Sequence, residues 1–159
     1  MAAAARELRE ACGGRSPPEA NLHLTLAFLG AVGAHRRPEL RALADAVVTT
    51  PFDLDLVRVG CWRAQRLAWA APPACPPALT ALTGQLSDAL RRHGFHTERR
   101  AFKPHVTLLR NVVTAPPVQD LAAPLRWPVR GFVLVCSEPA AKGVQYRVIG
   151  QWPPGDARL

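Results

Sequence analysis

One short pattern, a histidine and a threonine separated by a single apolar residue, occurs twice in this chain. The first copy, His23 and Thr25, lies in the stretch NLHLTLAFLG, and the second, His105 and Thr107, lies in KPHVTLLRN. In both stretches apolar residues alternate with other residues, as they do in a half-buried β-strand. Because residues i and i+2 of a strand point to the same face, each copy should present an imidazole and a hydroxyl together.

The two copies are separated by about half of the 159-residue chain, which we interpret as the trace of an internal duplication. Two lobes would then each contribute one strand to a shared cleft. Two imidazoles on opposite sides of one phosphate can provide a base for an attacking water and an acid for the departing oxygen. Hydroxyl and cationic side chains can stabilise the charge on the phosphoryl oxygens, so this chemistry requires no metal.

The remaining hydrophobic patterns mix helices with strands. We expect helices at residues 2–11, 38–48 and 78–93, and strands at 21–30, 52–62, 66–72, 103–111, 128–138 and 144–152. The order of these elements lacks the strict alternation of a parallel doubly wound sheet. We therefore expect an α+β fold with antiparallel sheets. A chain of this length can bury a core as one domain or two small lobes without disulfides or metals.

The formal net charge of +8 indicates an anionic partner, most simply nucleic acid or a phosphorylated metabolite, although a solvated basic surface is an equal alternative. The four cysteines, Cys12, Cys61, Cys75 and Cys136, form no C-x-x-C pair and do not cluster with the histidines. This spacing argues against zinc and favours a reduced, cytoplasmic protein. No stretch resembles a membrane span or a secretory signal.

The paired motifs resemble those of the two-histidine (2H) phosphoesterase superfamily, and within it the RNA 2′,3′-cyclic phosphodiesterases, formerly called 2′-5′ RNA ligases. NLHLTLAFLG is similar to the first signature of the family, KPHVTLLR to the second, and GVQYRVIGQWP to its closing strand. The resemblance implies one bilobal domain over residues 1–159. In this α+β fold, two antiparallel sheets with pseudo-two-fold symmetry would line a central cleft, with helices outside.

The resemblance also implies an activity, which is the hydrolysis of a 2′,3′-cyclic phosphate at an RNA end to a 2′-phosphate, without metal or cofactor, with 2′-5′ ligation as the reverse reaction. By position, His23 would be the general acid that protonates the departing 3′ oxygen. His105 would be the general base that activates water. Thr25, Thr107 and Arg110 would bind the phosphate.

Two features fit the family pattern less directly. Phe28 matches an aromatic position near the bound base, yet strand alternation places it on the apolar face, opposite His23. The chain starts with MAAAARELRE, which is similar to the first helix of the family rather than to its opening strand. A missing opening strand would expose a sheet edge and allow self-association of an otherwise monomeric protein.

Two other functions remain open at this point. The same histidines and threonines could hydrolyse small cyclic nucleotides or 2′-5′ linked oligonucleotides, since only the shape of the cleft would distinguish these substrates. Alternatively, the chain could be an RNA-binding module without turnover. Intact histidines in both copies favour an enzyme over such a module.

Overall fold

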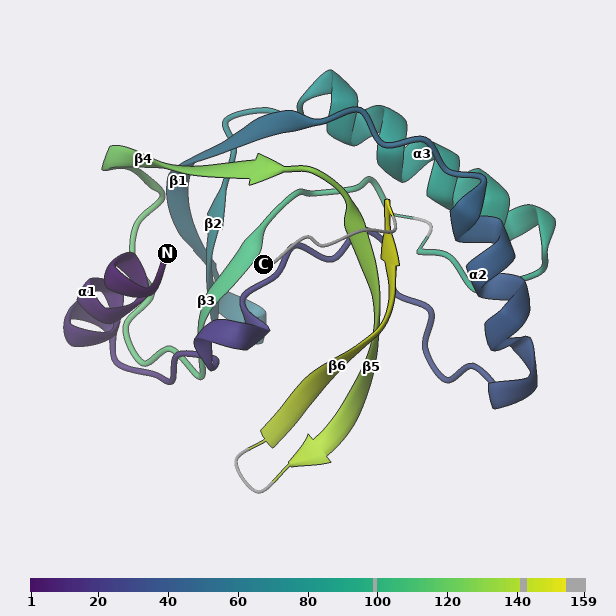
Figure 1. Cartoon of the computed structure of the whole chain (residues 1–159). Helices are drawn as coiled ribbons and strands as arrows, with labels where there is room; N and C mark the ends of the chain where they lie inside the picture. Colours follow the sequence, from purple (N-terminus) through teal and green to yellow (C-terminus); the bar gives the residue numbers. More distant parts are fainter. Residues whose placement is uncertain (99, 141–142, 154–159) are drawn as a thin grey trace. The chain divides into compact units, whose positions relative to one another are not determined.

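The computed structural model describes residues 1–98, 100–140 and 143–153 and contains three α-helices and six strands in this part of the chain (Figure 1). In chain order they are α1 (Ala2–Cys12), α2 (Arg37–Asp45), β1 (Phe52–Trp62), β2 (Leu67–Ala71), α3 (Pro77–Arg92), β3 (Val106–Arg110), β4 (Gln119–Val129), β5 (Phe132–Ala140) and β6 (Gly143–Trp152). The backbone forms two compact units. Unit 1 comprises Met1–Thr25, Asp53–Cys75 and Lys103–Trp127, and unit 2 comprises Leu26–Phe52, Pro76–Phe102 and Pro128–Leu159.

Unit 1 is built on a four-stranded sheet with the order β3-β2-β1-β4. Strands β1 and β2 form an antiparallel hairpin through a short 3-10 helix, Arg63–Gln65, which ends at Arg66 in the left-handed conformation (φ 51°). Strand β3 pairs antiparallel with the other side of β2. One face of the sheet is buried by apolar side chains from these strands, which include Leu54, Leu56, Val59, Ala68, Ala70, Val106, Leu108 and Leu109.

Unit 2 combines the antiparallel hairpin of β5 and β6 with helices α2 and α3. Its helices pack through a buried cluster that contains Leu40, Leu43, Ala89, Leu90 and Phe95. Glu39 connects the start of α2 to the residue after α3, because its Oε1 atom lies 3.3 Å from Nδ1 of His93. Its Oε2 atom also lies 2.8 Å from Nε of Arg36, at the start of α2. The Arg36 guanidinium also covers the ring of Phe95, 3.6 Å from its centroid.

The expected α+β fold with two antiparallel sheets and the three helices are confirmed. Strand β1 has the bounds that the alternation predicts, and the long helix α3 is followed at Gly94 by the positive φ expected of its C-terminal glycine. The second helix ends at Asp45 rather than Val48. Strand β4 was not expected as a separate strand, because Pro124 and Pro128 interrupt the sequence pattern of a strand. Prolines are tolerated there since β4 is an edge strand of its sheet.

The expectation of a strand at residues 21–30 is wrong. The chain leaves a 3-10 helix at Glu19–Asn21 and forms only one isolated β-bridge, at Leu24. The alternating apolar face also ends early, because the side chain of Phe28 is 70% exposed. Without neighbouring ladder hydrogen bonds beyond Leu24, nothing keeps the following residues in a strand conformation.

The structure also bears on membrane association and on the cysteines. Within the described residues, no helix has the length and hydrophobicity required to cross a bilayer. No disulfide joins the four cysteines, all of which lie in the described part of the chain.

Candidate active site

The single bridge of the first motif joins it to the second. Leu24 pairs antiparallel with Val106, so the same register places His23 opposite Thr107 and Thr25 opposite His105. Directly opposed residues have Cβ atoms about 4.5–5.5 Å apart, and diagonal neighbours are about 7–8 Å apart. Each histidine therefore faces the threonine of the other motif.

The two motifs come from distant parts of the chain but belong to the same compact unit. Residues up to Thr25 and residues from Lys103 onward are both segments of unit 1. The expectation that each lobe contributes one of the two motifs is therefore wrong. One bridge within a single unit brings the motifs together.

Both imidazoles are held in the same way at Nδ1. The Nδ1 atom of His23 lies 2.7 Å from the carbonyl oxygen of Asn21, and that of His105 lies 2.9 Å from the carbonyl oxygen of Lys103. A carbonyl oxygen can only accept a hydrogen bond, so Nδ1 carries a proton and donates it in both rings. Nε2 of each ring is then the atom that can accept or give up a proton.

The two imidazoles differ in their second contact. The Nε2 atom of His23 lies 3.1 Å from the Thr25 hydroxyl oxygen, within hydrogen-bond distance. The ring of His105 instead packs against Trp62 in a T-shaped arrangement, with centroids 4.5 Å apart. Trp62 packs in turn against Trp69, with centroids 6.0 Å apart. These tryptophans belong to no motif of the sequence; the signal that could have identified them is their place on either side of the short Arg63–Gln65 turn.

A β-bulge sets the direction of Arg110. The register between β2 and β3 shifts at Ala68 and Trp69, which leaves Leu108 as an extra residue in β3. In a regular strand, Thr107 and Arg110 would point to opposite faces because they are three residues apart. The bulge reverses the alternation between them, so Arg110 emerges on the same face as Thr107. Arg110 is exposed at the end of the strand.

Phe28 is not part of this constellation of unit 1. It belongs to unit 2, and its ring is exposed. Within the described residues, no group of three or more histidine, cysteine, aspartate or glutamate side chains is arranged to hold a metal ion.

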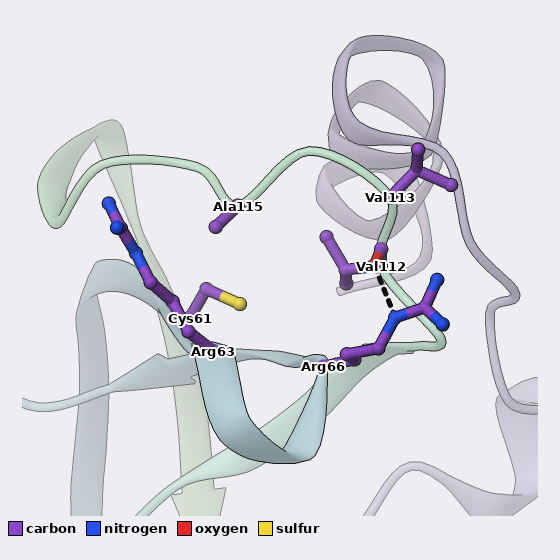
Figure 2. Close-up of a pocket in the computed structure, with 6 residues that line it drawn as sticks. All are labelled: Cys61, Arg63, Arg66, Val112, Val113 and Ala115. Atoms are coloured by element: carbon purple, nitrogen blue, oxygen red, sulfur yellow. Dashed lines mark hydrogen bonds between the residues drawn. The ribbon is translucent and has the colours of Figure 1, made fainter.

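An open pocket of about 470 Å³ lies near the turn between β1 and β2, and none of its lining residues was expected at the site (Figure 2). It is lined by Cys61, Arg63, Arg66, Val112, Val113 and Ala115. The side chain of Arg66 is hydrogen-bonded to the loop after β3, since its Nε donates to the carbonyl oxygen of Val112 at 3.0 Å. Cys61 neighbours Trp62 in strand β1 and so points to the other face of the sheet. The pocket is therefore separate from the face that carries the histidines.

Comparisons with known proteins agree with this constellation. Residues 1–138 match the family model of the 2′-5′ RNA ligase superfamily. The RNA 2′,3′-cyclic phosphodiesterase of Escherichia coli is 34% identical over 143 residues, which cover 86% of this chain and 81% of that protein. The protein of the same name from Thermus thermophilus is 33% identical over 146 residues, covering 86% of this chain and 74% of that protein.

Solved structures show the same fold. The crystal structure of E. coli LigT complexed with 3′-AMP superposes with a TM-score of 0.83 at 30% sequence identity, covering 96% of this chain and 91% of that one. The crystal structure of TT0787 from T. thermophilus gives a TM-score of 0.78 at 30% identity, covering 94% and 86%. With its two opposed histidine–threonine motifs, its fold and a family match over most of its length, the chain belongs to the 2′-5′ RNA ligase superfamily.

Proposed function

We propose that this protein is an enzyme that hydrolyses the 2′,3′-cyclic phosphate at an RNA end to a 2′-phosphate. The observation that carries the proposal is the antiparallel pairing of the two motifs, which places each histidine opposite the threonine of the other motif. Relatives that carry the name RNA 2′,3′-cyclic phosphodiesterase align with most of the chain and support the same substrate class.

The proposed reaction is an in-line displacement at phosphorus. His105, neutral at Nε2, takes a proton from water as the water oxygen forms a bond to phosphorus. The bond between phosphorus and the 3′ oxygen breaks, and His23 gives its Nε2 proton to that oxygen. One water molecule is consumed and the phosphate remains on the 2′ oxygen. The fixed Nδ1–H donors support these roles, because they leave Nε2 of each ring as the atom that exchanges protons.

The phosphate would be bound by hydroxyls and a guanidinium. Thr25 and Thr107 can each donate a hydrogen bond to a phosphoryl oxygen, and Arg110 can make a charge-assisted contact. Such donors stabilise the negative charge that develops on phosphorus-bound oxygens, which makes the proposed reaction independent of metal ions. The resemblance of the sequence to the family suggests a base-stacking role for Phe28, which is exposed and therefore accessible to a base.

We further propose that the chain acts as a cytoplasmic monomer. The scattered spacing of the four cysteines in the sequence fits a reducing compartment. Light scattering during size-exclusion chromatography tests the monomeric state, and a dimer mass would point to pairing through an open sheet edge.

The first experiment is the incubation of the purified chain with an RNA oligonucleotide that ends in a 2′,3′-cyclic phosphate, in the presence of EDTA. The products are resolved into 2′-phosphate and 3′-phosphate ends. We expect only the 2′-phosphate, at the rate measured without EDTA. A 3′-phosphate product would mean that the bond between phosphorus and the 2′ oxygen breaks instead of the bond to the 3′ oxygen. Loss of activity with EDTA would overturn the metal-independent mechanism. A folded protein that binds the oligonucleotide without turnover would be an RNA-binding module.

A further inference from the structure

Two arginines face each other at the end of β3, where Arg15 forms an antiparallel bridge with Arg110. The backbone amide of Arg15 donates to the carbonyl oxygen of Arg110 at 2.8 Å, and that of Arg110 donates to Arg15 at 2.9 Å. Residues that exchange both hydrogen bonds in this way are directly opposite, with Cα atoms about 5.5 Å apart and side chains on the same face. The sequence placed Arg15 only in a loop, so nothing in its motifs indicated this pair.

Among the described residues, neither guanidinium of the pair has an acidic partner. Both side chains are exposed, and within the described part of the chain neither side chain makes a hydrogen bond or an ion pair. Other arginines of the same sheet have acidic partners. The Nε atom of Arg58, for example, lies 3.1 Å from Oδ1 of Asp120. Like charges directly opposite each other destabilise a pair of strands, so the arrangement favours an anion between them.

The arginine pair stands on the same face of the sheet as the catalytic motifs. Arg110 pairs with Leu67, and Leu67 pairs with Trp62 in the neighbouring strand, so these three side chains form one row across the sheet. Trp62 is the residue whose ring contacts His105. The β-bulge in β3 makes this alignment, because it turns Arg110, and with it Arg15, to the face of Thr107.

We propose that Arg15 binds the RNA backbone phosphate that precedes the cyclic phosphate, while Arg110 faces the reacting group. This inference rests on the proposed function. It adds that an oligonucleotide is a better substrate than a single nucleotide with the same cyclic phosphate. A guanidinium can donate two parallel hydrogen bonds to phosphate oxygens, which suits an exposed position beside a nucleic acid strand. A nucleoside 2′,3′-cyclic phosphate has no preceding phosphodiester, so it leaves Arg15 without a partner.

The test compares Arg15→Ala with the wild-type chain on two substrates, a nucleoside 2′,3′-cyclic phosphate and a short oligonucleotide ending in the same group. Loss of a charge-assisted contact should lower kcat/KM for the oligonucleotide by about tenfold or more beyond any loss for the nucleotide. Arg15→Lys should recover part of the difference because it keeps the charge. Arg6→Ala, which removes an exposed charge from α1 of the same unit, controls for the change in net charge.

A binding measurement gives a second readout that does not depend on turnover. The affinity for an oligonucleotide ending in a 2′-phosphate is measured over a range of salt concentrations. For a single strand, the loss of one phosphate contact should lower the magnitude of the log–log salt slope by about 0.7. The slope should keep its wild-type value in Arg6→Ala.

The outcomes separate this inference from the proposed function. If wild-type protein hydrolyses neither substrate, the proposed function fails. If it hydrolyses both and Arg15→Ala loses the same factor on each, or no more than Arg6→Ala, the inference about Arg15 is wrong while the function stands. A selective loss on the oligonucleotide together with the smaller salt slope supports the inference.

Discussion

The two histidines are equivalent at Nδ1 and different at Nε2. Each ring donates Nδ1–H to the carbonyl oxygen two residues earlier, so the backbone of each motif fixes its own imidazole. The Nε2 atom of His23 lies 3.1 Å from the hydroxyl oxygen of Thr25, and the ring of His105 packs against the indole of Trp62. These different contacts support the proposed assignment of opposite proton-transfer roles to the two rings.

Removing either imidazole should reduce turnover much more than binding. We expect His23→Ala and His105→Ala each to lower kcat on a cyclic phosphate-ended RNA by about 10²–10⁴-fold, the usual contribution of a general acid or base. The affinity for the RNA should change little, since the proposed phosphate contacts remain. Single-turnover kinetics and equilibrium binding measure the two quantities separately.

His35→Ala is the matched control, because His35 is an exposed histidine of unit 2 outside both motifs. It should retain wild-type turnover and binding. If the variants at His23 and His105 lose affinity and rate by the same factor, these residues bind substrate and the acid–base roles are wrong.

At the scale of elements, the hairpin of β1 and β2 depends on a glycine. Gly60 pairs with Trp69, and a Cβ atom at Gly60 would lie 2.6 Å from the Cζ2 atom of that indole. Because Trp69 also packs against Trp62, the ring cannot move without disturbing the aromatic contact beside His105. We expect Gly60→Ala to destabilise the protein by about 1–3 kcal/mol, as overpacking does. Urea denaturation followed by circular dichroism measures the change.

Gly84→Ala provides the comparison in a helix. A Cβ atom at Gly84, within α3, would meet no atom within 4 Å, so the substitution removes backbone entropy from the unfolded chain without a clash. It should stabilise the protein by about 0.5–1 kcal/mol. Equal effects of the two substitutions would show that the aromatic packing over Gly60 is looser than the structure indicates.

The contacts of Glu39 make the junction of α2 and α3 sensitive to acid. The hydrogen bond from Arg36 lowers the pKa of the Glu39 carboxyl below its ordinary value of 4.5, and His93 contributes in the same direction. A lowered folded pKa stabilises the fold above the unfolded value, and this stabilisation is lost as the pH falls through the folded pKa. We expect the difference in urea midpoint between wild type and Glu39→Gln to be small, because the site is exposed, and to vanish at low pH. A difference that grows as the pH falls would contradict this assignment.

Elements with strong periodicity could be predicted from the sequence, and those fixed by distant pairing could not. Helix α3 and strand β1 have regular patterns of their own, so their residue types alone indicate them. The first motif was expected in a full strand, but a single bridge to Val106 is enough to orient it. Strand β4 contains prolines, which argue against a strand when only the sequence is known. They are compatible with a strand here because β4 lies at the edge of its sheet.

The same distinction applies to the candidate site. The two histidine–threonine pairs could be identified from sequence because i and i+2 spacing has a local meaning. The direction of Arg110 depends on a bulge whose position is set by pairing with Ala68 and Trp69. The partnership of Arg15 with Arg110 depends on a bridge between segments far apart in the chain. Register of this kind is a tertiary property, and no local pattern encodes it.

At the scale of the whole molecule, six chain segments alternate between the two units. If unit 2 unfolded by itself, unit 1 would carry residues 26–52 and 76–102 as two disordered loops. Closing a flexible loop of roughly 27 residues costs about 3 kcal/mol by the logarithmic relation, so the two loops cost about 6 kcal/mol. That is a large part of the roughly 5–15 kcal/mol by which a typical domain is stable. The interleaved chain therefore couples the stability of the two units.

We accordingly expect unfolding in one cooperative transition. Tryptophan fluorescence reports mainly on unit 1, which holds Trp62, Trp69 and Trp127, whereas far-UV circular dichroism is weighted toward helices α2 and α3 of unit 2. Their urea midpoints should coincide. The stabilising change Gly84→Ala lies in unit 2 and should raise both midpoints by the same amount. Separate midpoints, or a shift seen by circular dichroism alone, would mean that the units unfold independently. In that case, structure remaining in the unfolded segments would lower the free energy of loop closure below the value given above.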